Sequence, residues 1–318
     1  MKRRNFLGKT IKASAGLAML PAFLLKEKTF TKSIRRGSTQ GPVPAPQTWL
    51  DSDITAAWIG HSTVLINFLG TWILTDPVLF DTIGLYFLGM TFGQNRYSAP
   101  ALEFDQIPKP DIILLSHAHM DHMDYKTLLN FTDKFPNQID CITAYNTSDV
   151  INDLGWRSLR EIDWGEEFKL REIYFRALEV KHFGWRLPWE KDRSKGYFKE
   201  GRSYNAYLIE KNGRKILFGG DTAFSEKFLV IKDEEIDIAI MPIGAYNPWR
   251  FNHCNPEEAL IMSSVQLKAK NFLPIHCNTF RQGVEPVDEP LRWLHTSAPH
   301  YNINIGINKI GETFILKA

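Results

Sequence analysis

Three short, uninterrupted apolar runs in this sequence stop at residues whose side chains can bind metal. The runs are 112–115, which stops at Ser116-His117, 216–218, which stops at Gly219-Gly220-Asp221, and 272–275, which stops at His276. Runs of this kind are typical of strands buried on both faces, and a side chain at the end of such a strand projects into a loop. The sequence therefore predicts a core of buried strands with candidate ligands gathered at the strand ends.

Helices and hairpins alternate with these runs. Helical signals cover 124–131, 255–260 and 286–294, and the second of them begins with an Asn cap and a Pro in its first turn. The stretch 65–74 resembles 208–217 at a constant offset of 143 residues, and both have the pattern of a hairpin with Gly in its turn. We therefore expect two related halves, each with a sheet, that pack face to face with helices outside.

The first residues have the sequence pattern of a targeting segment. Arg3-Arg4, followed by Asn-Phe-Leu and an apolar stretch shorter than the ~20 residues of a spanning helix, resembles a twin-arginine export signal. We expect residues 1–25 to be a signal or a retained anchor, 26–48 to be a linker, and 49–318 to be the folded domain. Export by the twin-arginine machinery would place the protein in the periplasm or at the outer face of the cytoplasmic membrane.

The distribution of charge along the sequence does not indicate a nucleic-acid-binding surface. The chain has 38 basic and 36 acidic residues, a formal net charge of +2, and no sustained basic block outside its first 40 residues. We therefore expect a small molecule or a lipid as the partner, and no nucleic acid.

The densest cluster of candidate ligands follows the first apolar run. His117, His119, Asp121 and His122 lie within six positions, so one loop presents three imidazoles and a carboxylate. A lone histidine is usually a core residue, but packing does not explain three of the chain's nine histidines in one short loop. Imidazole and carboxylate groups are good ligands for zinc. Candidates elsewhere complete a set of seven: Asp221, where the preceding glycines let the backbone pass close to a metal, His276 and His182.

The cysteines offer a minor alternative. There are three, at irregular spacing, which argues against a disulfide framework. Cys254 and Cys277 each follow a histidine, so ligation of zinc by a thiolate is conceivable, although the histidines and carboxylates already fill two sites.

The run Ser-His-x-His-x-Asp-His-x-Asp over 116–124 resembles the signature of the metallo-β-lactamase superfamily. More specifically, the chain resembles the N-acylphosphatidylethanolamine-hydrolysing phospholipase D group and its bacterial relatives. The matching blocks are 58–63, 74–77, 117–125, 162–164, 220–222, 241–246, 256–259 and 275–280. The resemblance implies a four-layer αββα sandwich of two related halves for the hydrolase domain. It also implies two zinc ions per chain, one held by His117, His119 and His182, the other by Asp121, His122 and His276, with Asp221 bridging them.

The same resemblance implies a zinc-dependent phosphodiester hydrolase of phospholipase D type that acts on N-acylphosphatidylethanolamine-like lipids through a metal-bridging hydroxide. The charges of two zinc ions, two aspartates and a hydroxide leave roughly +1 facing an anionic phosphodiester. The expected catalytic residues are Asp121, Asp76 and His253. Asp76 would orient a ligating histidine, and His253 would protonate a leaving alkoxide, unless it only caps the helix that follows.

The chain departs from that group at 79–90, 186–203 and between Tyr246 and His253, all of which we expect to line the substrate mouth. An aromatic and basic rim there would bind substrate, with core packing as the alternative for each aromatic residue. The candidate substrate-binding residues are Tyr246, Trp249, Arg250 and Trp185. His61 also ends a predicted strand and is expected to be structural, either in the core or near the site. The apolar stretch 78–90 is too short to span a bilayer but is suited to a membrane surface.

Two other functions fit the same residues. One is hydrolysis of a lactone, a carboxylic ester or a β-lactam, because the same hydroxide attacks a carbonyl carbon equally well. The other is a non-catalytic zinc-binding scaffold, which the presence of all seven ligand types argues against.

Overall fold

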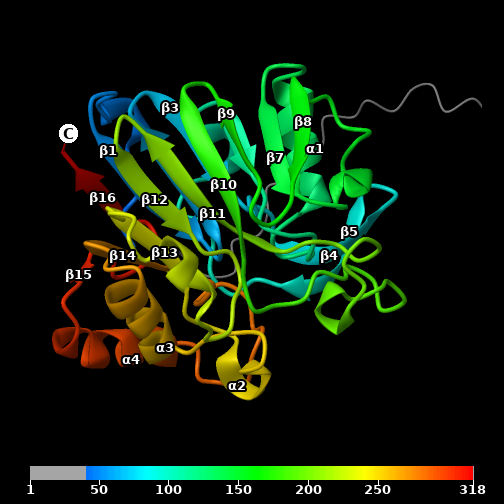
Figure 1. Ribbon diagram of the computed structural model, residues 1–318. Helices are drawn as coiled ribbons and strands as arrows, with labels where there is room; N and C mark the ends of the chain where they lie inside the picture. The colour runs from blue at the N-terminus through cyan, green and yellow to red at the C-terminus, as the bar shows by residue number, and fades with distance from the viewer. Residues whose placement is uncertain (1–40, 318) are drawn as a thin grey trace, which may run out of the picture. The chain divides into compact units, whose positions relative to one another are not determined.

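The computed structural model describes residues 41–317, which form two seven-stranded sheets packed face to face (Figure 1). The expected signal or anchor over 1–25, and the linker up to residue 40, lie outside the described residues. The end of the expected linker differs from the prediction, because Pro44 and Pro46 are buried and Pro46–Thr48 forms a turn of 3-10 helix. Residues 41–48 are therefore part of the domain. Within the described range, none of the helices combines the length and hydropathy that crossing a bilayer requires.

The first sheet changes from antiparallel to parallel pairing at its centre. Its four antiparallel strands are β16(Thr313–Leu316), β1(Ile54–Gly60), β2(Thr63–Phe68) and β3(Thr71–Thr75). Parallel to β3 follow β6(Ile112–Leu114), β7(Asp140–Ala144) and β8(Ser158–Ile162).

The second sheet repeats this pattern. Its antiparallel strands are β9(Glu167–Leu170), β10(Ile173–Glu179), β11(Asn205–Lys211) and β12(Arg214–Phe218). Parallel to β12 follow β13(Ile238–Pro242), β14(Asn271–Ile275) and β15(Asn304–Ile305). Both sheets therefore have four antiparallel strands followed by three parallel ones, and the predicted relation between two halves is confirmed.

The two hairpins that suggested a duplication have the same register. Leu65 pairs with Leu74 in the first, and Leu208 pairs with Leu217 in the second, at the predicted offset. In each turn the two central residues have positive φ angles: Leu69 and Gly70 in the first, Asn212 and Gly213 in the second. The hairpins also touch, because the Lys211 ammonium donates to the carbonyl of Leu69 at 2.7 Å and to the Thr71 hydroxyl at 2.9 Å.

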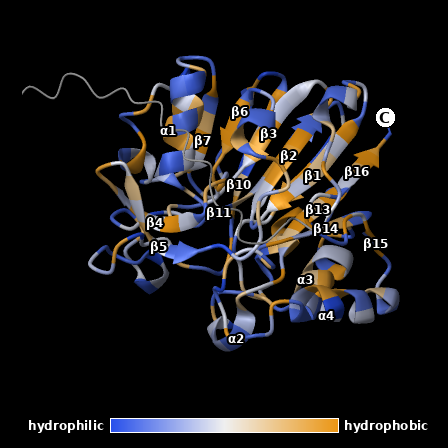
Figure 2. Cartoon of the chain, turned by 180° about the vertical axis from the view of Figure 1, so that it is seen from behind, coloured by the Kyte–Doolittle hydropathy of each residue, from blue (hydrophilic) through white to orange (hydrophobic). Residues whose placement is uncertain are grey.

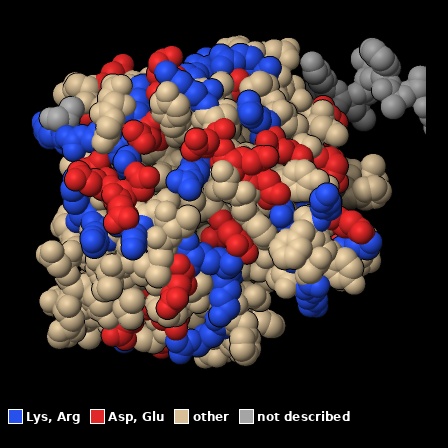
Figure 3. Space-filling model, in the orientation of Figure 1, with Lys and Arg blue, Asp and Glu red and all other residues tan. Residues whose placement is uncertain are grey.

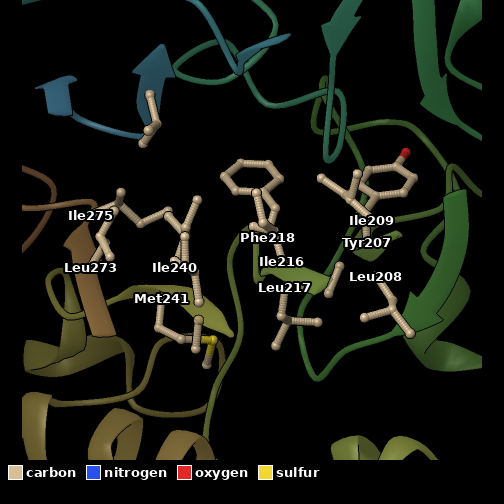
Figure 4. Packing of buried hydrophobic residues seen from close by; sticks show 14 of the residues in the cluster. Tyr207, Leu208, Ile209, Ile216, Leu217, Phe218, Ile240, Met241, Leu273 and Ile275 are labelled. Carbon is tan, nitrogen blue, oxygen red and sulfur yellow. The ribbon is translucent and has the colours of Figure 1, made fainter. Parts of the chain in front are cut away.

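The apolar runs are buried on both faces, as predicted. In β6, Ile112 and Leu114 face the second sheet, whereas Ile113 packs on the outside with α1. In the second sheet, Tyr207 and Phe218 lie on one face and Leu217 on the other (Figure 4). The Tyr207 hydroxyl donates to the carbonyl of Leu115 at 2.9 Å, so this first face is the one turned toward the first sheet. Burial on both faces accounts for the absence of polar alternation in these runs.

Helices form the outer layers. Helix α1(Tyr125–Lys134) begins at the predicted place, where the Asp124 side chain accepts from the amide of Thr127, and its buried side chains pack with the outer face of the first sheet. Helix α3(Pro256–Ile261) has the predicted Asn255 cap, closed by Glu258 as a capping box. It packs with β13 and α4(Glu289–Ser297), and the short α2(Tyr246–Trp249) precedes it. Helix α4 begins three residues later than predicted, after a turn in which the Glu289 amide donates to Pro286. Hydrophobic residues concentrate on the strands, loops are mostly hydrophilic, and α1 and α3 carry residues of both kinds (Figure 2).

One hairpin stands apart from the sandwich. Strands β4(Thr82–Phe87) and β5(Met90–Asn95) pair only with each other. On the face of the molecule seen in Figure 3, Lys and Arg side chains lie among Asp and Glu side chains, which agrees with the near balance of charges in the sequence.

Replacement of Lys211 tests the contact between the hairpins. Lys211→Met should lower the free energy of unfolding by about 1–2 kcal/mol, because the carbonyls of Phe68 and Leu69 lose a charged donor. Urea unfolding followed by circular dichroism measures the change. Lys215→Met is the control, because the partly exposed pair of Lys215 with Glu234 is worth at most about 1 kcal/mol. Equal losses in both variants would contradict a special role for Lys211.

Candidate metal centre

The candidate ligands lie where strands end. The loop 116–124 follows β6 of the first sheet, and His182, Asp221 and His276 follow β10, β12 and β14 of the second. Backbone hydrogen bonds tie the strand ends together, since the amide of Asn205 donates to Ser116 at 2.9 Å. The centre is therefore assembled from both sheets.

Three histidines form the first group. His119 Nδ1 lies 2.8 Å from His117 Nε2 and 3.3 Å from His182 Nε2. The other ring nitrogen of His182, Nδ1, lies 2.9 Å from the carbonyl of Asn252. A carbonyl at that distance takes the ring N–H, so Nε2 is left to face the group.

A carboxylate and two histidines form the second group. The Nε2 atoms of His122 and His276 each lie 3.4 Å from Asp121 Oδ2. Asp221 lies between the groups: its Oδ2 is 3.1 Å from His122 Nε2 and from His276 Nε2, and 3.9 Å from His182 Nε2. The structure thus brings all seven expected residues together in the two expected groups, and their ligation of metal stays a prediction.

These residues fit a metal because several of their buried polar atoms have no hydrogen-bond partner. The atoms without a partner include Nε2 of His122, Nε2 of His276 and Oδ1 of Asp221. A buried polar atom without a partner is costly, and a cation bound at the second group would satisfy the two imidazole nitrogens. Sets of three or more of these groups lie within 4.8 Å of one another, as ligands of one ion must.

The pKa values suit ligation as well. Burial and the neighbouring imidazoles lower the pKa of His117 well below its usual value and that of His119 to about 3, so both rings are neutral. Burial alone would raise the pKa of Asp221, but the imidazoles of His122 and His276 lower it well below its usual value. For His276 the effects are opposite: burial alone would lower its pKa, but the Asp221 and Asp121 carboxylates raise it to about 9. Metal binding at the second group therefore displaces a proton.

Asp76 supports the centre from behind. It follows β3 and is fully buried, and its Oδ2 lies 2.7 Å from His122 Nδ1. It also accepts from the amide and the hydroxyl of Ser116, at 2.7 Å and 2.6 Å. The expected orienting role matches this position, because a carboxylate on Nδ1 fixes the tautomer that leaves Nε2 free. The Asp76 carboxylate is fully buried behind Ser116 and His122, so we do not expect it to touch a substrate.

Two further residues shape the loop 116–124. A Cβ on Gly220, whose φ is +56°, would lie 2.7 Å from the carbonyl of Asn205 and 2.8 Å from the Ser116 Cβ, so Asp221 needs a glycine before it. Arg186 Nη1 donates to the carbonyls of Ala118 and Met123, at 2.6 Å and 3.0 Å. The segment 186–203, which departs from the resembled group, therefore also braces the metal loop.

His61 belongs to the centre, although the sequence analysis expected a structural role. Its Nε2 lies 2.9 Å from Asp121 Oδ2, and its ring packs on that of His276 at 4.3 Å between centroids. Its backbone is held from the other half of the chain, since the amide of His276 donates to its carbonyl. His61 joins Asp121, His122 and His276 in one group able to hold a metal. Its position after a strand had left a place near the site open, but its inclusion in this group was not predicted.

His253 lies beside Asp221 and is partly exposed. Its Nδ1 is 3.8 Å from Asp221 Oδ2 and has no hydrogen-bond partner, and its ring stacks on His276. The alternative role as a helix cap is wrong, because the Asn255 side chain caps α3.

The expected substrate rim is only partly present. Trp185 lies near the centre, with its ring 6.3 Å from that of His119, and Trp249 is half exposed. Tyr246 is buried and donates its hydroxyl to Glu289 at 2.6 Å, so core packing is the role its position supports. The guanidinium of Arg250 forms an ion pair with Glu258, so its charge is already paired within the chain.

The cysteine alternative finds no support among the described residues. Cys254 and Cys277 are buried and free, and burial raises the pKa of both thiols well above the usual value. The Cys254 thiol donates to the carbonyl of Pro242. Neither sulfur belongs to a group that could hold a metal.

Replacement of Asp76 tests its support of His122. Asp76→Asn keeps the volume and tolerates the positive φ angle at this position, but it removes an acceptor from Ser116 or His122. We expect metal affinity to fall about 10- to 100-fold. Competition with a chelating dye, together with metal content by mass spectrometry, measures the change. Asp105→Asn, at an exposed pair with Lys134, is the control; unchanged affinity in Asp76→Asn would rule out the orienting role.

Comparison with known proteins identifies the family. The model of the beta-lactamase superfamily domain matches residues 71–277, which include all seven candidate ligands. The chain is 28% identical over 259 residues to N-acyl-phosphatidylethanolamine-hydrolyzing phospholipase D 1 of Caenorhabditis elegans, covering 75% of this chain and 69% of that protein. It is 26% identical over 289 residues to an uncharacterized protein of Mycobacterium tuberculosis, covering 88% and 74%. The solved structure of Igni18, a metallo hydrolase of Ignicoccus hospitalis, matches with a TM-score of 0.59 and 18% identity, covering 84% of this chain and 99% of that chain, which shows the fold. The chain therefore belongs to the beta-lactamase superfamily, with the metallo-β-lactamase fold of a metal-dependent hydrolase and a cluster of histidines and aspartates able to bind metal.

Proposed function

We propose that the chain is a two-zinc phosphodiester hydrolase of phospholipase D type that acts on N-acylphosphatidylethanolamine-like lipids. The observation that carries the proposal is the pair of ligand groups with Asp221 between them, which matches the two-metal arrangement of phosphodiester hydrolases. The named activity of the Caenorhabditis elegans relative supports the choice of substrate.

The residues would hold one zinc ion at His117, His119 and His182 and a second at Asp121, His122 and His276, with Asp221 shared. When bound, two zinc ions would lower the pKa of a bound water to about 7, which activates it at neutral pH, and would stabilise both the attacking and the leaving oxygen.

The chain's own groups supply the rest of the chemistry. Asp76 holds His122 in one tautomer through Nδ1. Phe183 and Trp185 pack against His119, with ring centroids 4.4 Å and 6.3 Å away, and exclude water from the first group. Burial lowers the pKa of His253 well below its usual value, so its ring is neutral and would donate an N–H hydrogen bond to the leaving alkoxide oxygen, which takes its proton from the attacking water.

The cellular setting is part of the proposal. Export through the twin-arginine machinery would bring the enzyme to the periplasm or to the outer face of the cytoplasmic membrane, where phospholipid is available. This part depends on residues 1–25, which lie outside the described residues.

Product analysis tests the reaction. The zinc-loaded full chain should convert N-acylphosphatidylethanolamine into phosphatidate and N-acylethanolamine. In water labelled with ¹⁸O, mass spectrometry should find the label in the phosphatidate, because water attacks phosphorus and the ethanolamine oxygen leaves with a proton. A panel of lactones, carboxylic esters and β-lactams runs beside it. Ring opening of a lactone with intact lipid would replace the proposal with carbonyl hydrolysis, and inertness toward every substrate would favour the scaffold alternative.

Replacement of Asp221 tests the shared carboxylate. Asp221→Ala should lose bound metal and fall to the rate of protein-free buffer, since both groups lose their common ligand. Metal content and product formation are measured on the same preparation. Asp233→Ala, at an exposed residue, is the control; full activity in Asp221→Ala would exclude the shared role.

A further inference from the structure

The β4–β5 hairpin has an unusual composition for an exposed element. No charged residue occurs from Thr82 to Asn95, and several of its large apolar side chains are exposed. The hairpin pairs with no other strand of the described chain and lies at the edge of the molecule in both views (Figures 1 and 2). Exposed apolar patches of this kind mark interaction sites.

The register places these side chains on one face. Leu85 lies opposite Phe92, and Phe87 lies opposite Met90; because side chains alternate, all four share a face, and each is 52–65% exposed. The other face carries Tyr86, whose ring stacks on that of Tyr125 in α1 at 5.5 Å. The hairpin is therefore held to the domain by one face and offers the other to its surroundings.

The tip is apolar too. The turn consists of Leu88 and Gly89, both with positive φ angles, and Leu88 is 79% exposed. Asn-Gly is the preferred pair in a turn of this type, and leucine is strained there. An exposed leucine at this position is explained by a partner that binds Leu88 at the tip as well as the apolar face of the hairpin.

Charged residues appear only at the base of the hairpin. Lys126 lies over the ring of Phe80 at 4.3 Å, and the carbonyl of Arg281 accepts from the Gln94 side chain. Asp81 also lies at the base and is exposed. An uncharged tip with Tyr86 and Lys126 below it matches the order of hydrocarbon, interface and phosphate in a lipid monolayer.

The base of the hairpin also touches the metal centre. Gln282, next to Arg281, donates to Asp121 Oδ2 at 2.8 Å and accepts from the indole of Trp249 at 3.2 Å through its carbonyl. Phe251, two residues beyond Trp249, is 79% exposed. A single loop thus joins the hairpin, an exposed aromatic segment and a candidate ligand.

We infer that the β4–β5 hairpin is a membrane-docking device, which inserts Leu85, Phe87, Leu88, Met90 and Phe92 into the outer part of a phospholipid bilayer. A second copy of the chain would cover the apolar face but leave the tip in water, so the bilayer is the occupant that accounts for both. Docking is independent of the reaction at the metal centre.

A label at the tip tests the insertion. All three native cysteines are buried, so Leu88→Cys in the full chain can be labelled at one site with an environment-sensitive fluorophore. Vesicles of phosphatidylcholine and phosphatidylglycerol should shift its emission to the blue, and nitroxide-bearing lipids should quench it. Val230→Cys, at a residue 63% exposed in another part of the domain, is the control and should respond to neither. A tip label that stays in water, whether or not the chain binds vesicles elsewhere, would overturn the inference. A blue shift without vesicles that grows with protein concentration would assign the face to a second copy instead.

A substitution that favours the turn separates docking from stability. Leu88→Asn creates the preferred Asn-Gly pair, so the melting temperature should hold or rise. The vesicle dissociation constant of the metal-loaded full chain should increase about tenfold, because one buried apolar side chain is lost. Unchanged affinity in a variant that folds normally would contradict insertion of the tip. This experiment measures vesicle binding and not turnover. A negative result would therefore not contradict the proposed reaction, and an inactive enzyme would not contradict docking.

Discussion

The Asp221 carboxylate, buried among four imidazoles, is the interaction on which the rest of the structure depends. A buried carboxylate is costly unless positive charge or hydrogen-bond donors surround it. His122, His182, His253 and His276 all approach its Oδ2 within 4 Å, from four different loops. The loops can converge only because the strands before them end at one edge. A favourable site for the Asp221 carboxylate therefore requires the two sheets to pack with these edges together.

The repeated strand pattern explains how one centre draws on both halves. Each half changes from antiparallel to parallel pairing at its fourth strand, and the parallel strands have their carboxyl ends at a common edge. The first half supplies the loop 116–124 and the supporting Asp76, and the second supplies His182, Asp221 and His276. The hydrogen bond from the amide of His276 to the carbonyl of His61 joins the halves at the centre itself.

Much of this was predictable from sequence because the signals are local. Apolar runs identify strands buried on both faces, Gly in a turn identifies a hairpin, and Asn255 with Glu258 identifies a helix start. The dense loop 116–124 identifies the centre. His61 was given no ligand role because a single histidine after Gly60 has no local partner, and only the fold brings it to Asp121. The buried role of Tyr246 depends on Glu289, which is distant in sequence. The apolar stretch 78–90 was expected at a surface, and residues 85–90 of the β4–β5 hairpin include exposed apolar side chains. Its pairing as a free-standing hairpin could not be predicted, since apolar content alone does not identify the partner of a strand.

The brace from Arg186 to the metal loop has a consequence for how this protein diversifies. The segment 186–203 departs from the resembled group, yet its first residue fixes the carbonyls of Ala118 and Met123 from outside. Two further anchors hold the rest of the segment, since Arg193 pairs with Asp163, and Arg202 pairs with Asp149 and Glu190. Between these anchors residues 194–200 are exposed. Substitutions there can therefore change the surface of the segment while the ligand geometry stays constant, so that surface and the metal chemistry can evolve on separate parts of the same loop.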